Sequence, residues 1–580
     1  MLKALRFLKP YRLGVIFVFA MVALRAVLDL ILPRILGLLV SEGIGLGENT
    51  VSPNTARIWE LTFVMLGATV ISIIITIISG YVESRISAGF AKDLRKAVYK
   101  KIESFSLREM DHFTTSSLIT RSTNDIQQLQ GIVNSLLRMI ILAPFLAVGA
   151  IIFSVAENPS LSMMLIASIV ALIIMIFIIF SITMPKFEIM QKLVDRLNLV
   201  TRENLTGLRV VRAYNTQAFQ AKRIDDAAQE SMRLNIFVNR IMSAMWPIMG
   251  LIMGGTSLAI VYFGSDMVGI NGFDPGSMMA LIQYASRAIM AFMFLSFIFI
   301  MIPRASISAR RIMEVLEMEI EISDPKNPAE LPSSFKGEVE FRDVCFQYPD
   351  AQAPVLSNIS FTAKPGTTTA FIGSTGSGKS TLINLIPRFY ERTCGEITID
   401  GIDIKDMTQE QLHSLMGYVP QKGVLFSGSI KDNILFSTQE DDEKTMKEAA
   451  EIAQATEFID QIEEKYEHNI AQGGVNVSGG QRQRLSIARA IAKKPIIYIF
   501  DDSFSALDYK TDQKLRKMLD ERITATKLIV AQRINTIRYA DQIIVLDQGT
   551  MVCKGTHPEL MQSCAVYQEI ASSQLSKEEL

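Results

Sequence analysis

The sequence has few of the residues that hold metal ions or form cross-links. Its 580 residues include four cysteines and four histidines. Because the cysteines show no CxxC spacing, we expect reduced thiols that form neither a metal site nor a disulfide. The cysteines are Cys345, Cys394, Cys553 and Cys564.

Excess charge is absent as well. The formal net charge is −1 at pH 7, without a basic tail or stripe, which argues against nucleic acid as a partner. No cleavable signal peptide is evident. The basic, amphipathic opening "MLKALRFLKPYR" instead predicts a short helix on the cytosolic face of a membrane.

Apolar residues are abundant, at 49% of the chain, and mean hydropathy is +0.27. Hydropathy divides the chain near residue 320, and six apolar stretches precede that point. Each is long enough to cross a hydrocarbon core of roughly 30 Å, which takes about 20 residues. Arg138 and Pro144 interrupt the third. The predicted spans are about 13–42, 57–83, 129–156, 159–184, 241–269 and 275–303.

Lysine and arginine predict the orientation of these spans. The long connections 84–128 and 185–240 are rich in both residue types, whereas the short connections 43–56, 157–158 and 270–274 contain neither. We therefore expect both termini and the long connections to be cytosolic. Few Gly or Pro residues interrupt the long connections, so the spans are predicted to continue as helices beyond the bilayer.

The second half has another pattern. Residues 1–320 are predicted to form an all-α six-helix transmembrane domain, and the polar segment 321–337, with Pro and Ser, a linker. In residues 338–580, short β-branched runs such as "TTTAFIG" and "PIIYIFD" alternate with helical stretches. This alternation predicts an α/β nucleotide-binding domain with a largely parallel sheet.

A phosphate-binding loop stands in that second half. "GSTGSGKST" (373–381) fits GxxxxGK[ST] and lies between an apolar strand and a predicted helix, the context that the motif requires. Lys379 is expected to reach the β- and γ-phosphates and Ser380 to ligate Mg²⁺. A merely flexible Gly/Ser-rich loop is the alternative. The residues assigned to ATP are Gly373, Ser374, Thr375, Gly376, Ser377, Gly378, Lys379, Ser380 and Thr381.

Two further segments complete the pattern. Asp501 ends the apolar run "IYIF" and is placed to deliver a carboxylate to Mg²⁺. "VSGGQRQRLSIARA", which begins at Val477, offers a hydroxyl and close backbone approach at a helix start. P-loop, SGGQ and Asp501 in this order resemble the ATPase of ATP-binding cassette (ABC) transporters, and the six spans resemble the transmembrane domain of an ABC exporter half-transporter.

The resemblance implies roles for further residues. Tyr348 matches the aromatic that stacks on adenine, and Gln421 the glutamine that senses Mg²⁺ and the attacking water. Asp508 matches the loop that crosses the dimer interface. In this family two ATPase domains sandwich two ATP molecules, each between one P-loop and the other domain's signature. The signature residues here are Ser478, Gly479, Gly480 and Gln481.

At two positions the sequence departs from the family. Asp502 stands where the family has the catalytic glutamate, so its carboxylate is withdrawn by one methylene; a misplacement of about 1 Å can cost on the order of 100-fold in rate. Gln532 stands where the family has a histidine that contacts the γ-phosphate, and an amide cannot shuttle a proton as imidazole does. The chain's own site is therefore predicted to bind ATP and hydrolyse it weakly.

The intact signature suggests a partner. Since the signature acts in the other domain's site, a homologous half-transporter with the family's Glu and His would make use of it, forming a heterodimer with one hydrolytic site. A slowly hydrolysing homodimer is the alternative. Residues near 106–115 and 207–216 resemble the family's coupling helices, which dock into the ATPase domains; a solvated helical face is the alternative for them.

The predicted spans also contain candidates for contact with the cargo. Charges inside spans are candidates for function, among them Arg25, Asp29 and Arg138, although Arg25 and Asp29 lie at i, i+4 and can pair. The last two spans are rich in methionine, an adaptable residue. The alternative is that these methionines only face the lipid or pack between helices. The candidate cavity residues are Arg287, Trp246 and Met290.

Together these features predict a multi-pass protein of the bacterial plasma membrane. We expect a subunit of an ATP- and Mg²⁺-dependent exporter of amphipathic or lipophilic compounds, of the multidrug type. The alternatives are a lipid or peptide exporter and an ATP-gated regulatory or channel-like membrane protein without efficient turnover.

Overall fold

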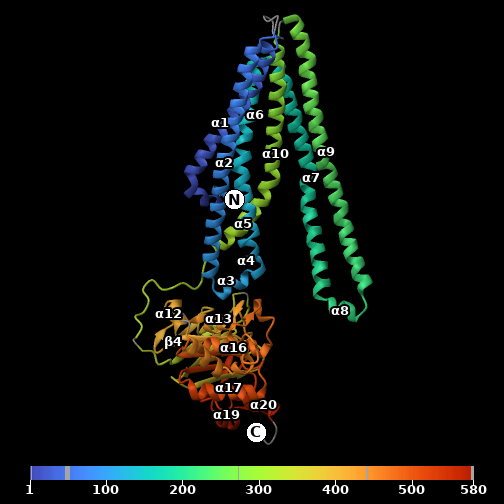
Figure 1. Ribbon diagram of the computed structural model, residues 1–580. Helices are drawn as coiled ribbons and strands as arrows, with labels where there is room; N and C mark the ends of the chain where they lie inside the picture. Colours follow the sequence, from blue (N-terminus) through green and yellow to red (C-terminus); the bar gives the residue numbers. More distant parts are fainter. Residues whose placement is uncertain are drawn as a thin grey trace. The chain divides into compact units, whose positions relative to one another are not determined.

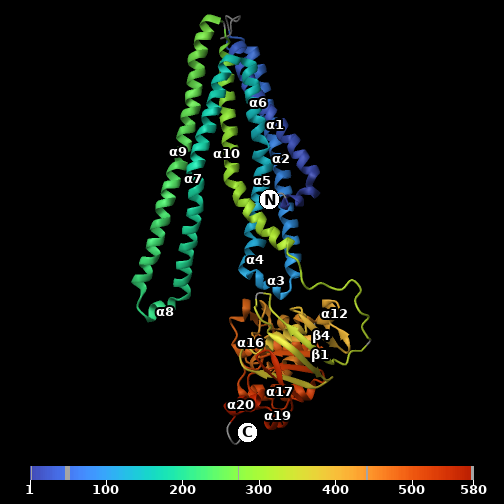
Figure 2. The same cartoon turned by 180° about the vertical axis from the view of Figure 1, so that it is seen from behind.

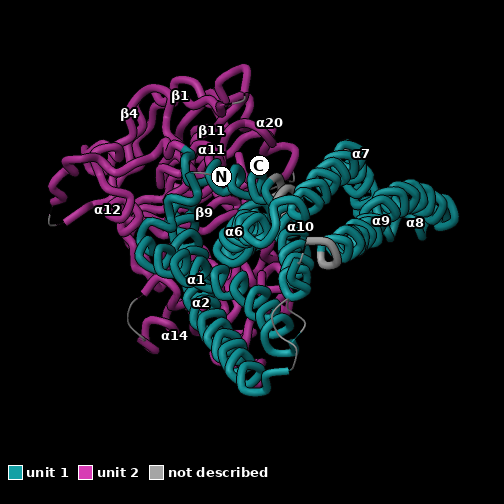
Figure 3. Tube along the Cα trace, turned by 90° about the horizontal axis from the view of Figure 1, so that it is seen from above, with its two compact units in different colours: residues 1–103, 115–318 teal, residues 104–114, 319–580 magenta. Residues whose placement is uncertain are grey.

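The computed structural model describes residues 1, 3–45, 53–271, 273–332, 334–349, 351–438 and 442–575. The predicted connection 43–56 and linker 321–337 lie partly outside these ranges. The chain forms two compact units (Figure 3): Met1–Glu103 with Thr115–Met318, and Ser104–Thr114 with Glu319–Leu580. The second unit thus takes in a short segment from the N-terminal half.

The described residues of the first unit form helices and no strands (Figures 1 and 2). Six of its described helical segments are long and apolar enough to cross a membrane, as predicted. The elements are η1 (Ala4–Tyr11), α1 (Arg12–Leu38), η2 (Leu39–Gly43), α2 (Thr55–Glu103), α4 (Thr115–Ser122), α5 (Asn124–Ser135), η3 (Leu136–Ile140), α6 (Leu142–Glu157), α7 (Pro159–Thr206), α8 (Leu208–Ala213), α9 (Gln217–Asn271) and α10 (Pro275–Glu317).

Several helices extend well past a bilayer, as their Gly- and Pro-poor sequence predicts. Helices α2, α7 and α9 contain 49, 48 and 55 residues. At about 1.5 Å per residue these are roughly 70 to 80 Å long, against a hydrocarbon core of about 30 Å. Helices α7 and α9 run side by side and are joined at one end by α8 (Figures 1 and 2).

Local sequence explains where these helices begin and bend. Asn158 accepts a hydrogen bond from the Leu161 N–H at the start of α7, and Pro159 occupies the first turn. Asp274 and Pro275 start α10 in the same way. The third span contains the π-helical turn η3, around Arg138. Such turns interrupt otherwise regular helices, which accounts for the irregularity expected of this span.

Methionines of the last two spans are in part packing residues. Met245 and Met249 of α9 and Met293 of α10 are buried, in one cluster with apolar side chains of α7. For these three residues the structure supports the packing explanation rather than a cargo surface.

Helices α1 and α10 approach so closely that only glycine fits between them. A Cβ atom on Gly276 would lie 2.0 Å from the Gly37 carbonyl oxygen. We predict that Gly276→Ala lowers the melting temperature by several degrees, because forced overpacking costs about 1–3 kcal/mol. Thermal unfolding in detergent measures it. Gly254→Ala is the matched control, since nothing lies within 4 Å of a Cβ there; an equal loss in both variants would contradict the packing argument.

The second unit is an α/β domain with a six-stranded, mostly parallel sheet in the order β12-β11-β3-β10-β9-β6, as predicted. A four-stranded sheet, β2-β1-β4-β5, and the pair β7-β8 are antiparallel. The strands are β1 (Val339–Phe346), β2 (Leu356–Ala363), β3 (Thr368–Gly373), β4 (Cys394–Ile399), β5 (Ile402–Asp403), β6 (Met416–Val419), β7 (Gly428–Ser429), β8 (Asn469–Ile470), β9 (Ile497–Asp501), β10 (Thr526–Val530), β11 (Gln542–Asp547) and β12 (Thr550–Gly555).

Apolar side chains of β3, β9, β10 and β11 are buried on both faces of the larger sheet, which explains their β-branched runs. The helices of this unit are α3 (Leu107–His112), α11 (Lys379–Leu385), α12 (Gln409–Ser414), α13 (Ile430–Ile434), η4 (Leu435–Ser437), α14 (Glu443–Ile452), α15 (Thr456–Ile459), η5 (Lys465–Glu467), η6 (Gln472–Gly474), α16 (Gly479–Ala492), α17 (Tyr509–Arg522), α18 (Ile534–Ile537), α19 (His557–Ser563) and α20 (Ala565–Gln574).

The expectation of free cysteines was wrong. Cys345 of β1 faces Cys394 of β4 in the antiparallel register and forms a disulfide with it. Cys553 of β12 is bonded to Cys564, which stands between α19 and α20. The Cα atoms of the two pairs are 4.9 and 6.2 Å apart. Spacing along the sequence does not reveal such pairs, because strand register brings the partners together.

Candidate ATP site and its carboxylates

The P-loop connects β3 to α11. Gly373 has φ +157°, and a Cβ atom there would lie 2.0 Å from the Leu546 carbonyl oxygen, so the tight turn requires glycine. The Lys379 ammonium donates to the carbonyl oxygens of Gly373 (2.9 Å) and Ser374 (2.7 Å). Burial lowers the pKa of Lys379, and the charges of Asp502 and Asp501 oppose that shift. The loop's own carbonyl oxygens thus hold this cation at the point where the motif places the phosphates.

Two oxygen-bearing side chains that can ligate a metal ion lie in contact beside the P-loop. Ser380, at the start of α11, donates its hydroxyl to Asp501 Oδ1 at 2.9 Å. Asp501 ends β9 and is 5% exposed; burial raises the pKa of this carboxyl, and the Ser380 hydrogen bond lowers it. The sequence placed these two residues at one site, and the structure brings them into direct contact. A hydroxyl and a carboxylate together suit a small divalent cation such as Mg²⁺.

The two residues that depart from the family contact each other. Asp502 Oδ2 accepts a hydrogen bond from Gln532 Nε2 at 2.9 Å and another from Gln421 Nε2 at 3.3 Å. The Asp502 backbone is left-handed, with φ +46°, an uncommon conformation for a non-glycine residue. Burial raises the pKa of Asp502, while its hydrogen bond from Gln421 lowers it. One oxygen of this short carboxylate is therefore engaged by two amides.

Tyr348 lies beside the P-loop helix. Its hydroxyl and the Thr381 hydroxyl are 3.0 Å apart, and its ring meets the rings of Phe346 and Tyr390 edge-on at 4.8 and 5.3 Å between centroids. The ring is half-buried and held from two sides. This placement is compatible with the predicted stacking on adenine, which stays a prediction.

We predict that Tyr348→Ala weakens ATP binding by about two- to tenfold, because a lost aromatic contact is worth about 0.5–1.5 kcal/mol. Tyr348→Phe retains the ring and removes only the bond to Thr381, so its affinity should stay within about twofold. Titration with a fluorescent ATP analogue measures both variants. Equal losses in the two variants would mean that the hydroxyl, not the ring, matters.

The signature segment, Ser478–Gln481, starts helix α16. Ser478 Oγ accepts from the Gln481 N–H at 3.2 Å, and Gln481 Oε1 accepts from the Ser478 N–H at 2.9 Å, so the pair forms a capping box. A Cβ atom on Gly479 would meet nothing within 4 Å. The action of this segment at a partner's site stays a prediction. Asp508 caps the start of α17 through the Thr511 N–H at 3.0 Å.

Helix α3 contacts the ATPase domain within the second unit. Asp111 Oδ2 accepts from the Tyr390 hydroxyl at 2.7 Å, and the Leu107 N–H donates to the Phe389 carbonyl oxygen at 3.3 Å. Arg108 pairs with Glu321 at 2.7 Å. Burial, and then the hydrogen bond to Asp111, raise the pKa of Tyr390.

The sequence predicted that a segment near 106–115 contacts the ATPase domain, but it did not predict the partner Tyr390. The coupling role of the segment stays a prediction. The only feature of the sequence that could have indicated Tyr390 is that it is an aromatic residue shortly after the P-loop helix. The predicted second coupling segment, near 207–216, forms α8 and lies in the other unit.

The candidate cargo residues belong to the first unit. Trp246 of α9 and Met290 of α10 are 59% and 40% exposed, and Arg287 of α10 is half-buried. Arg25 and Asp29 pair at 3.6 Å, as their spacing allows, and Ser72 donates its hydroxyl to Asp29. The carboxylate in this span is thus satisfied by its own neighbours, and the three cavity residues stay predictions.

Comparison with known proteins identifies the family. Models of the ABC transporter transmembrane region and of the ABC transporter ATPase match residues 15–302 and 356–505. An uncharacterized ABC transporter ATP-binding protein of Mycobacterium tuberculosis (strain ATCC 25618 / H37Rv) is 38% identical over 571 residues, which cover 98% of this chain and 97% of the relative. The chain belongs to the ABC transporter family.

Two further similarities concern a named relative and the fold. An ATP-dependent lipid A-core flippase of Syntrophus aciditrophicus (strain SB) is 31% identical over 513 residues, covering 87% of the transporter and 83% of the flippase. A bacterial Atm1-family ABC exporter, solved with ATP bound, matches in fold with a TM-score of 0.82, 23% identity, and coverage of 98% and 100% of the two chains. The transporter has the fold of an exporter half-transporter, with a transmembrane region followed by an ATP-binding domain.

Proposed function

We propose that this transporter is the weak-site half of a heterodimeric exporter. The observation that carries the proposal is the hydrogen-bonded contact between Asp502 and Gln532. The carboxylate is one methylene shorter than the glutamate it replaces, and its Oδ2 is already engaged by Gln532 and Gln421. A carboxylate held back in this way is poorly placed to polarise a water against the γ-phosphate.

The chain's histidines do not compensate for Gln532. All four are described, and each has neighbours elsewhere: His413 bonds the Pro387 carbonyl oxygen, His468 pairs with Glu464, His557 bonds Tyr567, and the His112 ring packs on Phe113. The position opposite Asp502 therefore carries an amide that donates a hydrogen bond and does not shuttle protons.

The signature segment supports a partner that hydrolyses ATP. Ser478–Gln481 is an ordered helix start with an open Gly479. Such a segment is useful to a partner subunit that carries the family's Glu and His. Asp508, at the next helix start, would lie in the same dimer interface.

Mg²⁺ would be held by Ser380, Asp501 and Gln421. The ion would supply charge neutralisation for the transferred phosphoryl group. Asp501 and Ser380 are oriented toward each other by their own hydrogen bond, and the Lys379 ammonium is fixed on the loop's carbonyl oxygens. These groups bind ATP, and ATP hydrolysis takes place at the partner's site.

The proposed cargo is amphipathic or lipophilic, as in multidrug-type exporters. Its support is the exposed Trp246 and Met290 and the half-buried Arg287 on α9 and α10. A lipid cargo is the alternative that a specific similarity favours, since one relative is named a lipid A-core flippase. The transporter would lie in the bacterial plasma membrane with both termini and the ATPase domain in the cytosol.

The experiment is ATP turnover in lipid by the chain alone and by the complex with a co-purified partner. Negligible turnover alone and robust turnover together would support the division of labour. Robust turnover by the chain alone would overturn it, because Asp502 would then be a competent catalytic residue.

A further inference from the structure

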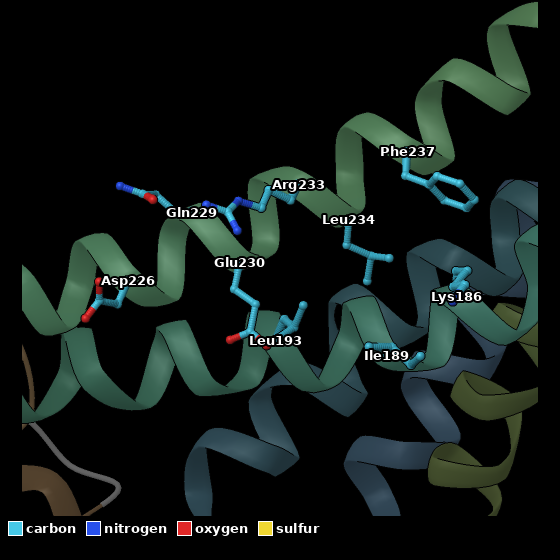
Figure 4. Close-up of a pocket in the computed structure, with 9 residues that line it drawn as sticks. All are labelled: Lys186, Ile189, Leu193, Asp226, Gln229, Glu230, Arg233, Leu234 and Phe237. Atoms are coloured by element: carbon cyan, nitrogen blue, oxygen red, sulfur yellow. The ribbon is translucent and has the colours of Figure 1, made fainter.

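We propose that a groove between α7 and α9 binds the phosphate of an anionic membrane lipid and the first part of its acyl chain. The groove has a volume of about 580 Å³ (Figure 4). Lys186 and Arg233 line it together with Ile189, Leu234 and Phe237. All of its lining residues belong to the first unit, and none of them is a candidate cargo residue.

The groove opens where the membrane-crossing parts of both helices end. Lys186 follows directly on the apolar run of α7, about 159–184, and Phe237 shortly precedes the apolar run of α9, about 241–269. The two helices are antiparallel neighbours, so these ends meet at one level. Lipid headgroups occupy that level in a bilayer.

The lining matches an anionic amphiphile in charge and in polarity. Ile189 and Phe237 are 45% and 43% exposed, so both present apolar surface in the groove. Among the described residues neither Lys186 nor Arg233 pairs with a carboxylate, whereas Glu230 in the same groove is paired with Arg196 at 3.0 Å. Two cations without an ion pair among the described residues, beside exposed apolar surface, are complementary to a phosphate joined to an acyl chain.

Charge also orients the ligand. Asp226 lies at the end of the groove farther from Phe237, and Lys186 at the end nearer to it (Figure 4). Lys186 therefore lies at the membrane border, Arg233 lies in the middle of the groove near Glu230, and Asp226 lies at the end away from the membrane (Figure 4). A phosphate is attracted to the membrane end, and the acidic end disfavours free polyanions from the water phase.

The test uses a tryptophan reporter in the groove of the full-length protein. Trp59→Phe and Trp246→Phe remove both native tryptophans, and Phe237→Trp places one in the groove. The protein is reconstituted in phosphatidylcholine vesicles that contain either brominated phosphatidylglycerol or an equal share of brominated phosphatidylcholine. We expect at least about twofold stronger quenching by the anionic lipid.

A matched pair of variants separates the groove from general attraction to the bilayer. Arg233→Glu should abolish the preference, whereas Arg240→Glu, which reverses an exposed charge on the same helix outside the groove, should keep it. Equal quenching by both lipids, or equal loss in the two variants, overturns the proposal. Absence of quenching by either lipid also overturns it, since the groove would then be covered by a second subunit. Because the test measures how close lipid lies to the groove, its outcome does not depend on the proposed heterodimer or on the proposed cargo.

Discussion

Gly479→Asp is expected to reduce ATP turnover of the assembled transporter at least about 100-fold, whereas Asp502→Asn should leave it within about twofold. In the proposed arrangement Gly479 faces the partner's ATP, and a carboxylate there repels the phosphates. Asp502 serves only the chain's own weak site. The difference between the two variants is informative, because a carboxylate at the catalytic position is ordinarily expected to affect turnover more than a glycine does.

The fold tolerates both changes. No atom lies within 4 Å of a Cβ on Gly479, and asparagine has the size of the aspartate it replaces. Turnover is measured on the purified complex in lipid, with the melting temperature of each variant as the control for folding. A large loss in Asp502→Asn at unchanged stability would contradict the weak-site assignment.

Restoring the family's residues should create activity in the chain alone. We expect the double variant Asp502→Glu, Gln532→His to raise turnover on the order of 100-fold, because it returns the carboxylate by one methylene and supplies an imidazole. The 2.9 Å contact explains why both changes are needed. The Gln532 amide would still engage the carboxylate and supply no imidazole, so Asp502→Glu alone should gain much less.

Steady-state phosphate release by the purified chain in lipid measures this gain. Adding Lys379→Ala to the double variant is the control, and it should remove the new activity by removing the phosphate-binding cation. If the double variant hydrolyses ATP as slowly as the parent, residues other than Asp502 and Gln532 cause the slow hydrolysis.

Much of the architecture followed from the sequence. The six spans were recognisable because a hydrocarbon core demands about 20 apolar residues in a row, whatever the neighbours. Lys379, Ser380 and Asp501 could be assigned to one site because a P-loop and a strand-end carboxylate are local motifs in a parallel sheet. The Arg25–Asp29 pair followed from helical spacing alone.

Other features depended on contacts between distant segments. The disulfides were missed because strand register and a turn between helices bring the cysteines together. The Gly37–Gly276 crossing and the contact between Tyr390 and Asp111 likewise join residues with no common local pattern. The groove at Lys186 and Arg233 arises only where α7 and α9 lie side by side.

By itself the sequence determined the membrane and ATPase halves, the phosphate-binding loop and the two departures at Asp502 and Gln532. Only the tertiary structure decided that those two side chains hold each other, with Gln421 as a second donor. The physical reason is that a motif consists of residues close together in the sequence. A hydrogen bond between strand ends depends instead on how β9, β10 and β6 lie together in the sheet.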